Sequence, residues 1–193
     1  MMNQISLVSL LNRAFEAPEE VLGTGERNAE IKIGFLALWA LGWHPIDDIA
    51  LGAQIPRNSF EPVAGAANAV DFLIRTGSST ICIVGEVKHW HTTEPAWRKG
   101  LYQLRRYRNA IPAPLAFLTT GKRWLIIDNA GCEHLVEEPD GAKLIEKLAP
   151  IMGKANVLEG LNDQSIWDYG INPSGSNRKA SKRSPLAGRV LLG

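Results

Sequence analysis

The sequence has few cysteines and no long apolar run, and both shortages limit what the protein can be. Two cysteines among 193 residues are too few for a disulfide framework or a four-cysteine zinc site, so the sequence favours a reducing cytoplasm. The longest apolar run, Phe35–Trp43, is about half of the roughly 18 residues that a membrane span needs. The first residues lack a basic start followed by an apolar run, so no secretory leader is expected. We therefore expect a cytoplasmic protein that makes no membrane contact.

Charge of either sign is nearly balanced overall, but it is unevenly distributed along the chain. The formal net charge is +1. Residues 71–128 carry 9 basic and 4 acidic side chains, and residues 172–193 carry 5 basic and no acidic ones. Because local patches rather than net charge attract a polyanion, these two zones are candidates for contact with nucleic acid.

Hydrophobic periodicity predicts an α/β fold in which helices flank a mixed central sheet. Helices are expected over 3–16, from an Asn28 N-cap to Leu41, over 95–110 and over 140–149. Strands are expected over 48–55, 70–75, 80–88, 115–119 and 123–128, with 56–68 as a loop. The second and third strands are predicted to form a hairpin. The predicted organisation is an N-terminal helix and link (1–25), a core domain (26–171) and a basic flexible tail (172–193).

Three charged residues stand out in the predicted hairpin: Asp71, Glu86 and Lys88. Such groups are costly to bury without partners, and hairpin pairing would bring Asp71 near Glu86. Two clustered carboxylates suit Mg²⁺, with Mn²⁺ as an alternative, and the carbonyl of Val87 would complete the ligand set. Lys88 would then hold or deprotonate the attacking water and offset phosphate charge, as in metal-assisted phosphodiester hydrolysis. The simpler interpretation is a solvent-facing strand with an ion pair.

Strand alternation also predicts which side chains accompany these residues. Glu86 and Lys88 should share one face with Cys82 and Val84 behind them. The other face should carry the remaining apolar residues of the strand, Ile81, Ile83 and Val87.

Several motifs in a fixed order resemble the PD-(D/E)XK nuclease superfamily. Asp71, a turn and then Glu86-Val87-Lys88 match the pattern that gives the superfamily its name, although Val70 stands where that name expects proline. The ordered segments LWALGWHP, AVDFLI, ICIVGEVKHW, GLYQLRRYRNA and AFLTTGKRWLIID resemble the N-terminal nuclease domain of type I restriction enzyme R subunits over about residues 26–150. The chain is too short for the helicase motor of such subunits and has no phosphate-binding glycine loop. A stand-alone nuclease or the nuclease subunit of a split system remains.

The resemblance implies a restriction-endonuclease-like core and a Mg²⁺-dependent deoxyribonuclease acting in restriction, phage defence or DNA processing. Gln103 and Tyr107 match the Q-x-x-x-Y motif of RecB-type nucleases, which supports the active site and contacts the DNA backbone. The family often adds an acid from the first core helix, here Glu30, with Glu26 as the alternative. Asp71, Glu86, Val87 and Glu30 would hold the metal.

Other interpretations remain open on sequence alone. The same fold can belong to a catalytically silent or partner-dependent DNA-binding or assembly subunit, and the substrate can be RNA or branched DNA. Protein partners from a restriction or defence system and a homodimer are both compatible with the resemblance. His89 and His91 suggest a zinc site, a phosphate contact or simply exposed histidines. Trp90 and Trp97 are candidates for base stacking or for core packing.

Overall fold

The computed structural model describes residues 4–17, 23, 26–54, 69–77, 80–111 and 113–162. The predicted loop over 56–68 and the predicted basic tail over 172–193 lie outside these residues. The described chain forms one six-stranded sheet whose spatial order follows the sequence. Its strands are β1 (Ile49–Gln54), β2 (Ala69–Thr76), β3 (Thr80–Val87), β4 (Leu115–Thr119), β5 (Arg123–Ile127) and β6 (Glu133–Glu137).

The sheet is mixed because one of its five strand pairs is parallel. β3 and β4 run parallel, whereas the other neighbouring pairs are antiparallel. Parallel neighbours need a crossover connection, and α5 (Glu94–Ala110) supplies it. The predicted α/β class, with a mixed sheet flanked by helices, is confirmed, and the arrangement is compatible with a restriction-endonuclease-like core.

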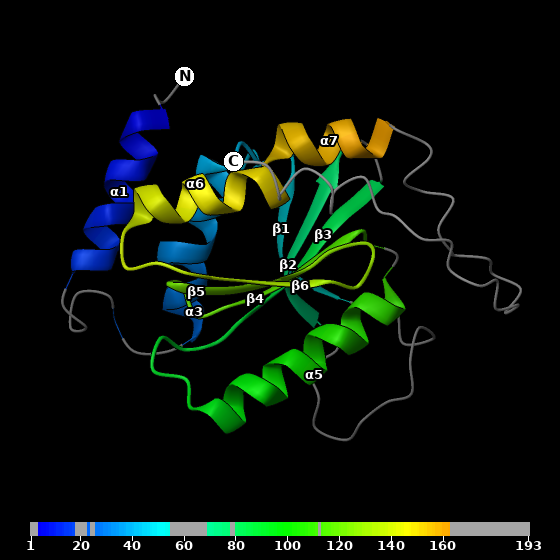
Figure 1. The fold of residues 1–193 in the computed structure, drawn as a ribbon, viewed down its shortest axis with the longest axis horizontal. Coiled ribbons are helices and arrows are strands. Elements are labelled where there is room, and N and C mark those ends of the chain that lie inside the picture. Colours follow the sequence, from blue (N-terminus) through cyan, green and yellow to red (C-terminus); the bar gives the residue numbers. More distant parts are fainter. Residues whose placement is uncertain are drawn as a thin grey trace, which may run out of the picture.

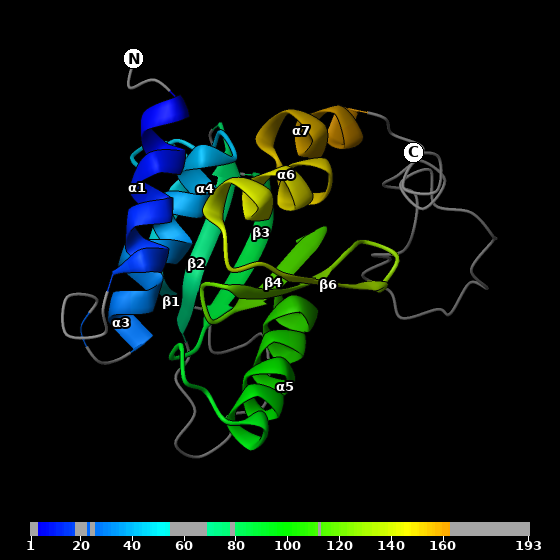
Figure 2. The ribbon, with the colours of Figure 1, turned by 60° about the vertical axis from the view of Figure 1, so that its left-hand side comes forward.

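Helices cover both faces of the sheet (Figures 1 and 2). Among the described helices, α5 is the one on the first face, where its buried side packs with Leu73, Val84 and Leu118. The opposite face carries a larger core centred on Phe72, Phe117 and Trp124. The helices on that face are α1 (Gln4–Glu16), α3 (Glu26–Ala29), the π-helix η1 (Glu30–Phe35), α4 (Leu36–Ala40), α6 (Gly141–Met152) and α7 (Lys154–Asn162).

The N-terminal helix α1 packs into this larger core. Leu11 and Phe15 are buried beside residues of α4 and α6. Gly141, the first residue of α6, donates its N–H to the Asn12 side chain at 2.7 Å. Within the described ranges, no helix combines the length and apolar character required to cross a bilayer.

Three helical segments and one strand differ from the sequence-based expectation. The first core helix begins at Glu26, so Asn28 lies within it rather than capping it. α6 continues past Pro150 to Met152, although proline lacks the N–H donor of a helix interior and is disfavoured there. Strand β6 and helix α7 were not predicted.

A register shift in the β2–β3 hairpin corrects the predicted faces of β3. Ile74 pairs with Ile83 but Arg75 pairs with Ile81, so Cys82 is the extra residue of a bulge. Cys82 consequently joins the larger core with Ile83, whereas Ile81 packs on the α5 side. Beyond the bulge the alternation holds, with Val84 on the α5 side and Val87 opposite.

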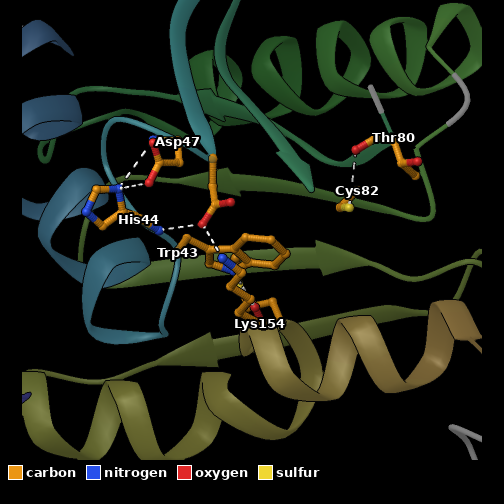
Figure 3. Close-up of polar contacts among 8 residues, drawn as sticks. Trp43, His44, Asp47, Thr80, Cys82 and Lys154 are labelled. Carbon is orange, nitrogen blue, oxygen red and sulfur yellow. Dashed lines mark hydrogen bonds and ion pairs between the residues drawn. The ribbon is translucent and has the colours of Figure 1, made fainter. Parts of the chain in front are cut away.

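A buried carboxylate fastens α7 to the start of β1. Lys154 Nζ and the backbone N–H of His44 both donate to Asp48 Oδ2, each at 2.6 Å. Figure 3 shows Lys154 beside the Trp43 ring, and Trp43 Nε1 donates to the Met152 carbonyl at 2.9 Å. Asp48 is only 6% exposed, and these donors offset the cost of burying its carboxylate.

Replacing Lys154 with methionine should therefore lower the free energy of unfolding by about 1–3 kcal/mol. The methionine keeps most of the stem but leaves the buried Asp48 carboxylate with fewer donors. Urea denaturation measures the change, and Lys143→Met, on the exposed side of α6, is the matched control. Equal stability of the Lys154 variant and the wild type would contradict this role.

Candidate active site

The end of the β2–β3 hairpin brings Asp71 beside the Glu86–Lys88 segment. Phe72 pairs with Gly85 across the two strands, which puts the preceding residue of β2 next to Glu86. Asp71 Oδ2 accepts a hydrogen bond from the backbone N–H of Val87 at 2.7 Å. The predicted proximity of Asp71 and Glu86 thus follows from the antiparallel register.

Glu86 and Lys88 form a largely buried ion pair. Lys88 Nζ lies 2.7 Å from Glu86 Oε1, and the two side chains are 13% and 3% exposed, respectively. The backbone N–H of Lys88 also donates to the Thr119 carbonyl at 2.8 Å, which extends the parallel β3–β4 pairing by one residue. A carboxylate this buried needs a cationic partner, and Lys88 supplies one positive charge.

Helix α5 places Gln103 and Tyr107 against this cluster. Gln103 Nε2 donates to the Tyr107 hydroxyl at 2.5 Å. Burial raises the pKa of Tyr107 above its ordinary value, the Gln103 hydrogen bond lowers it, and the carboxylates of Glu86 and Asp71 raise it further. The phenol is therefore neutral at pH 7 and carries its proton.

Glu30, the predicted helix acid, begins the π-helix η1. The described features of this element concern its packing: a Cβ on Gly34 would come within 3.1 Å of the Phe72 ring. That contact sets η1 close to β2, one residue from Asp71. The side chains of Glu30 and Glu26 lie outside the described part of the chain, so their roles stay predictions.

The aromatic and histidine residues after Lys88 do not form a second site with these carboxylates. The His89 and His91 rings lie 5.6 Å apart between centroids. The described residues contain no group of three or more histidine, cysteine, aspartate or glutamate side chains placed to hold a metal ion. Trp90 packs against the larger core and Trp97 is 5% exposed, so both contribute to core packing.

Two glycines shape the site and were not singled out from the sequence. Gly85 lies between Phe72 and Phe117 in the strand register, and Gly100 lies over Lys88. The available signal for Gly100 is its position inside a helix, because an interior glycine is costly unless packing requires it.

The donor set fits a hard divalent cation in its chemistry. Asp71 and Glu86 offer carboxylate oxygens, and Val87 between them offers a carbonyl, which are the ligand types that Mg²⁺ prefers. Two carboxylates and one ammonium also leave the cluster with a formal charge of −1. The described residues thus supply two of the carboxylates that such an ion would need.

Comparison with known proteins gave one structural likeness. Neither a protein-family model nor a curated protein matches the sequence. A solved structure from Vibrio vulnificus YJ016, described as the fragment structure of a putative HsdR subunit of a type I restriction enzyme, is similar with a TM-score of 0.44 and 18% sequence identity. The match covers 64% of this chain and 25% of that one, so the matched part spans about a quarter of that solved chain.

Proposed function

We propose that the protein is a metal-dependent DNA nuclease of the PD-(D/E)XK type, acting in restriction, phage defence or DNA processing. The observation that carries the proposal is the convergence of Asp71, Glu86 and Lys88 at the end of the β2–β3 hairpin. A buried ion pair alone would serve structure equally well. Asp71 adds a second carboxylate beside this pair, because it accepts a hydrogen bond from the N–H of the intervening Val87. Two clustered carboxylates and a lysine, in a helix-flanked mixed sheet, favour hydrolysis of a phosphodiester.

In this proposal Asp71, Glu86 and the Val87 carbonyl hold Mg²⁺ or Mn²⁺, with Glu30 as a further ligand. The ion, when bound, supplies Lewis acidity toward the phosphate and lowers the pKa of a coordinated water. Asp71 is kept in place by the Val87 N–H, which fixes the orientation of its carboxylate. The hydrogen bond from Val87 to Asp71 matters because a metal ligand works best when its own orientation is fixed.

Lys88 has two roles in the proposed reaction. Its ammonium lies at the Glu86 carboxylate, where it can orient the attacking water through a hydrogen bond. It also places a positive charge where negative charge develops on the phosphate. Tyr107 and Gln103 of α5 lie beside this cluster, where they would organise the substrate.

Lys88→Ala should reduce metal-dependent cleavage by about 10²–10⁴-fold, because it removes both the proton-handling group and its charge. The assay incubates supercoiled plasmid and linear duplex with the purified protein in Mg²⁺, Mn²⁺ or EDTA. Nicking of the plasmid distinguishes endonuclease from exonuclease action. Lys143→Ala, an exposed lysine on α6 across the sheet from α5, should cleave at the wild-type rate.

Absence of cleavage by the purified wild type in every metal would overturn the proposal of an autonomous DNA nuclease. If DNA still bound in EDTA, the result would favour the silent or partner-dependent subunit. RNA and branched DNA tested beside the duplex establish which nucleic acid is hydrolysed. EDTA-resistant cleavage, or cleavage unaffected by Lys88→Ala, would point to a contaminating nuclease.

A further inference from the structure

The inner face of α5 contains one glycine, and the stem of Lys88 occupies the space that its side chain would fill. A Cβ built on Gly100 would lie 3.0 Å from Lys88 Cε and 3.2 Å from Lys88 Cγ. It would also lie 3.1 Å from Leu118 Cδ1 of β4. These separations are tighter than nine in ten real Cβ contacts, so a residue larger than glycine requires Lys88 and Leu118 to shift by a few tenths of an ångström.

The contact decides the path of the lysine side chain. The stem of Lys88 passes beneath Gly100, and its ammonium reaches Glu86 Oε1 at 2.7 Å. An exposed lysine samples many rotamers, but this one is 13% exposed and covered by a helix. The backbone below is also fixed, because the Lys88 N–H donates to Thr119.

We infer that Gly100 is a positioning residue that holds the Lys88 ammonium at Glu86. The inference rests on the proposed function for its effect on cleavage, but the contact itself is independent of that function. The reason is steric. Helix α5 can lie close enough to confine the Lys88 side chain only if position 100 has no side chain of its own. The position therefore requires glycine even though alanine is the better helix former.

Gly100→Ala tests the inference through the reaction. Displacement of a reacting group by about 1 Å can cost roughly a hundredfold in rate. The added Cβ requires a shift of a few tenths of an ångström, so we expect kcat to fall about threefold to tenfold. KM and DNA binding in EDTA should stay within about twofold, since the Lys88 charge is proposed to act on negative charge that develops during the reaction rather than on bound DNA. Leu118→Val added to Gly100→Ala relieves the leucine contact alone, so it should not restore kcat. Full restoration by Leu118→Val would assign the effect to β4 packing and overturn the inference.

A second measurement needs no nuclease activity. The melting temperatures of wild type, Gly100→Ala, Lys88→Ala and the double variant form a double-mutant cycle. Gly100→Ala should lower the melting temperature when Lys88 is present. It should leave the melting temperature unchanged or raise it when Lys88 is alanine, because two of the three close contacts are then gone and alanine favours the helix.

The two measurements separate failure of the inference from failure of the proposed function. Equal shifts in both backgrounds would overturn the positioning role whatever the cleavage assay shows. Coupled shifts in a protein that cleaves nothing would support the contact and reject the nuclease. If the single variant Gly100→Ala does not fold, folding of the double variant Gly100→Ala/Lys88→Ala would itself support the contact. Failure of the single and the double variant to fold would overturn the inference.

Discussion

Asp71→Asn should reduce the cleavage rate at least about a hundredfold and weaken Mg²⁺ binding, without unfolding the protein. Even outer partners of metal ligands typically cost 10–100-fold, and Asp71 is proposed as a direct ligand. Asparagine has the same shape as aspartate and keeps an oxygen that can accept a hydrogen bond from the Val87 N–H. In the wild type this N–H lies 2.7 Å from Asp71 Oδ2. The variant therefore removes the charge while preserving the link between β2 and β3.

Two titrations of Asp71→Asn check this result: initial cleavage rates against Mg²⁺ concentration, and calorimetric binding of Mg²⁺ without DNA. Asp47→Asn is the control, because its carboxylate is 73% exposed and contacts His44 far along the chain from the cluster. The proposed ligand role would be wrong if Asp71→Asn bound Mg²⁺ like the wild type. A fall in stability equal to that of Asp71→Ala would instead assign Asp71 to hairpin packing.

Gly85→Ala should be strongly destabilising, at or above the roughly 1–3 kcal/mol typical of overpacked cores. An added Cβ would meet three atoms of the Phe117 ring, the nearest at 2.2 Å. That ring cannot easily withdraw, since its centroid is 5.8 Å from that of Phe72 and 5.0 Å from that of Trp124. Gly85 pairs with Phe72 on one side and Phe117 on the other, and the Phe117 ring lies over the glycine.

Adding Phe117→Leu to Gly85→Ala should partly restore the free energy of unfolding, as measured by urea denaturation. Leucine is smaller and more flexible than phenylalanine, so the double variant relieves the overlap. Phe117→Leu alone is the control for the packing that the ring provides. Gly85→Ala with wild-type stability would mean that β3 and β4 can separate locally at little cost.

The strand alternation of β3 was sufficient to predict that Glu86 and Lys88 share a face. It failed at Ile81 and Cys82 because a bulge adds one residue to β3, and periodicity assumes uninterrupted pairing. The antiparallel register that joins Asp71 to Glu86 was also predictable, since a short turn leaves few ways to pair the two strands.

Other features depend on contacts that a local pattern does not contain. β6 has five residues with glutamate at both ends, and only Val136 among them is buried, so its apolar signal is weak. α7 follows Gly153 directly after a proline-containing helix, where sequence signals predict an end rather than a new helix. The packing of Gly100 on Lys88 joins two segments through tertiary structure, and no spacing along the chain specifies it.

The single parallel pair in the sheet also orders the events of refolding. Thr119 and Trp124 of the β4–β5 hairpin pair five positions apart, whereas Ile83 of β3 pairs with Leu115, 32 positions later. Contacts between distant positions carry a larger loop-closure entropy and form more slowly. A refolding chain can therefore complete both hairpins, with Asp71 already beside Glu86, before α5 crosses the sheet and covers Lys88. The lysine, rather than either carboxylate, would be the last member of the cluster to reach its native geometry.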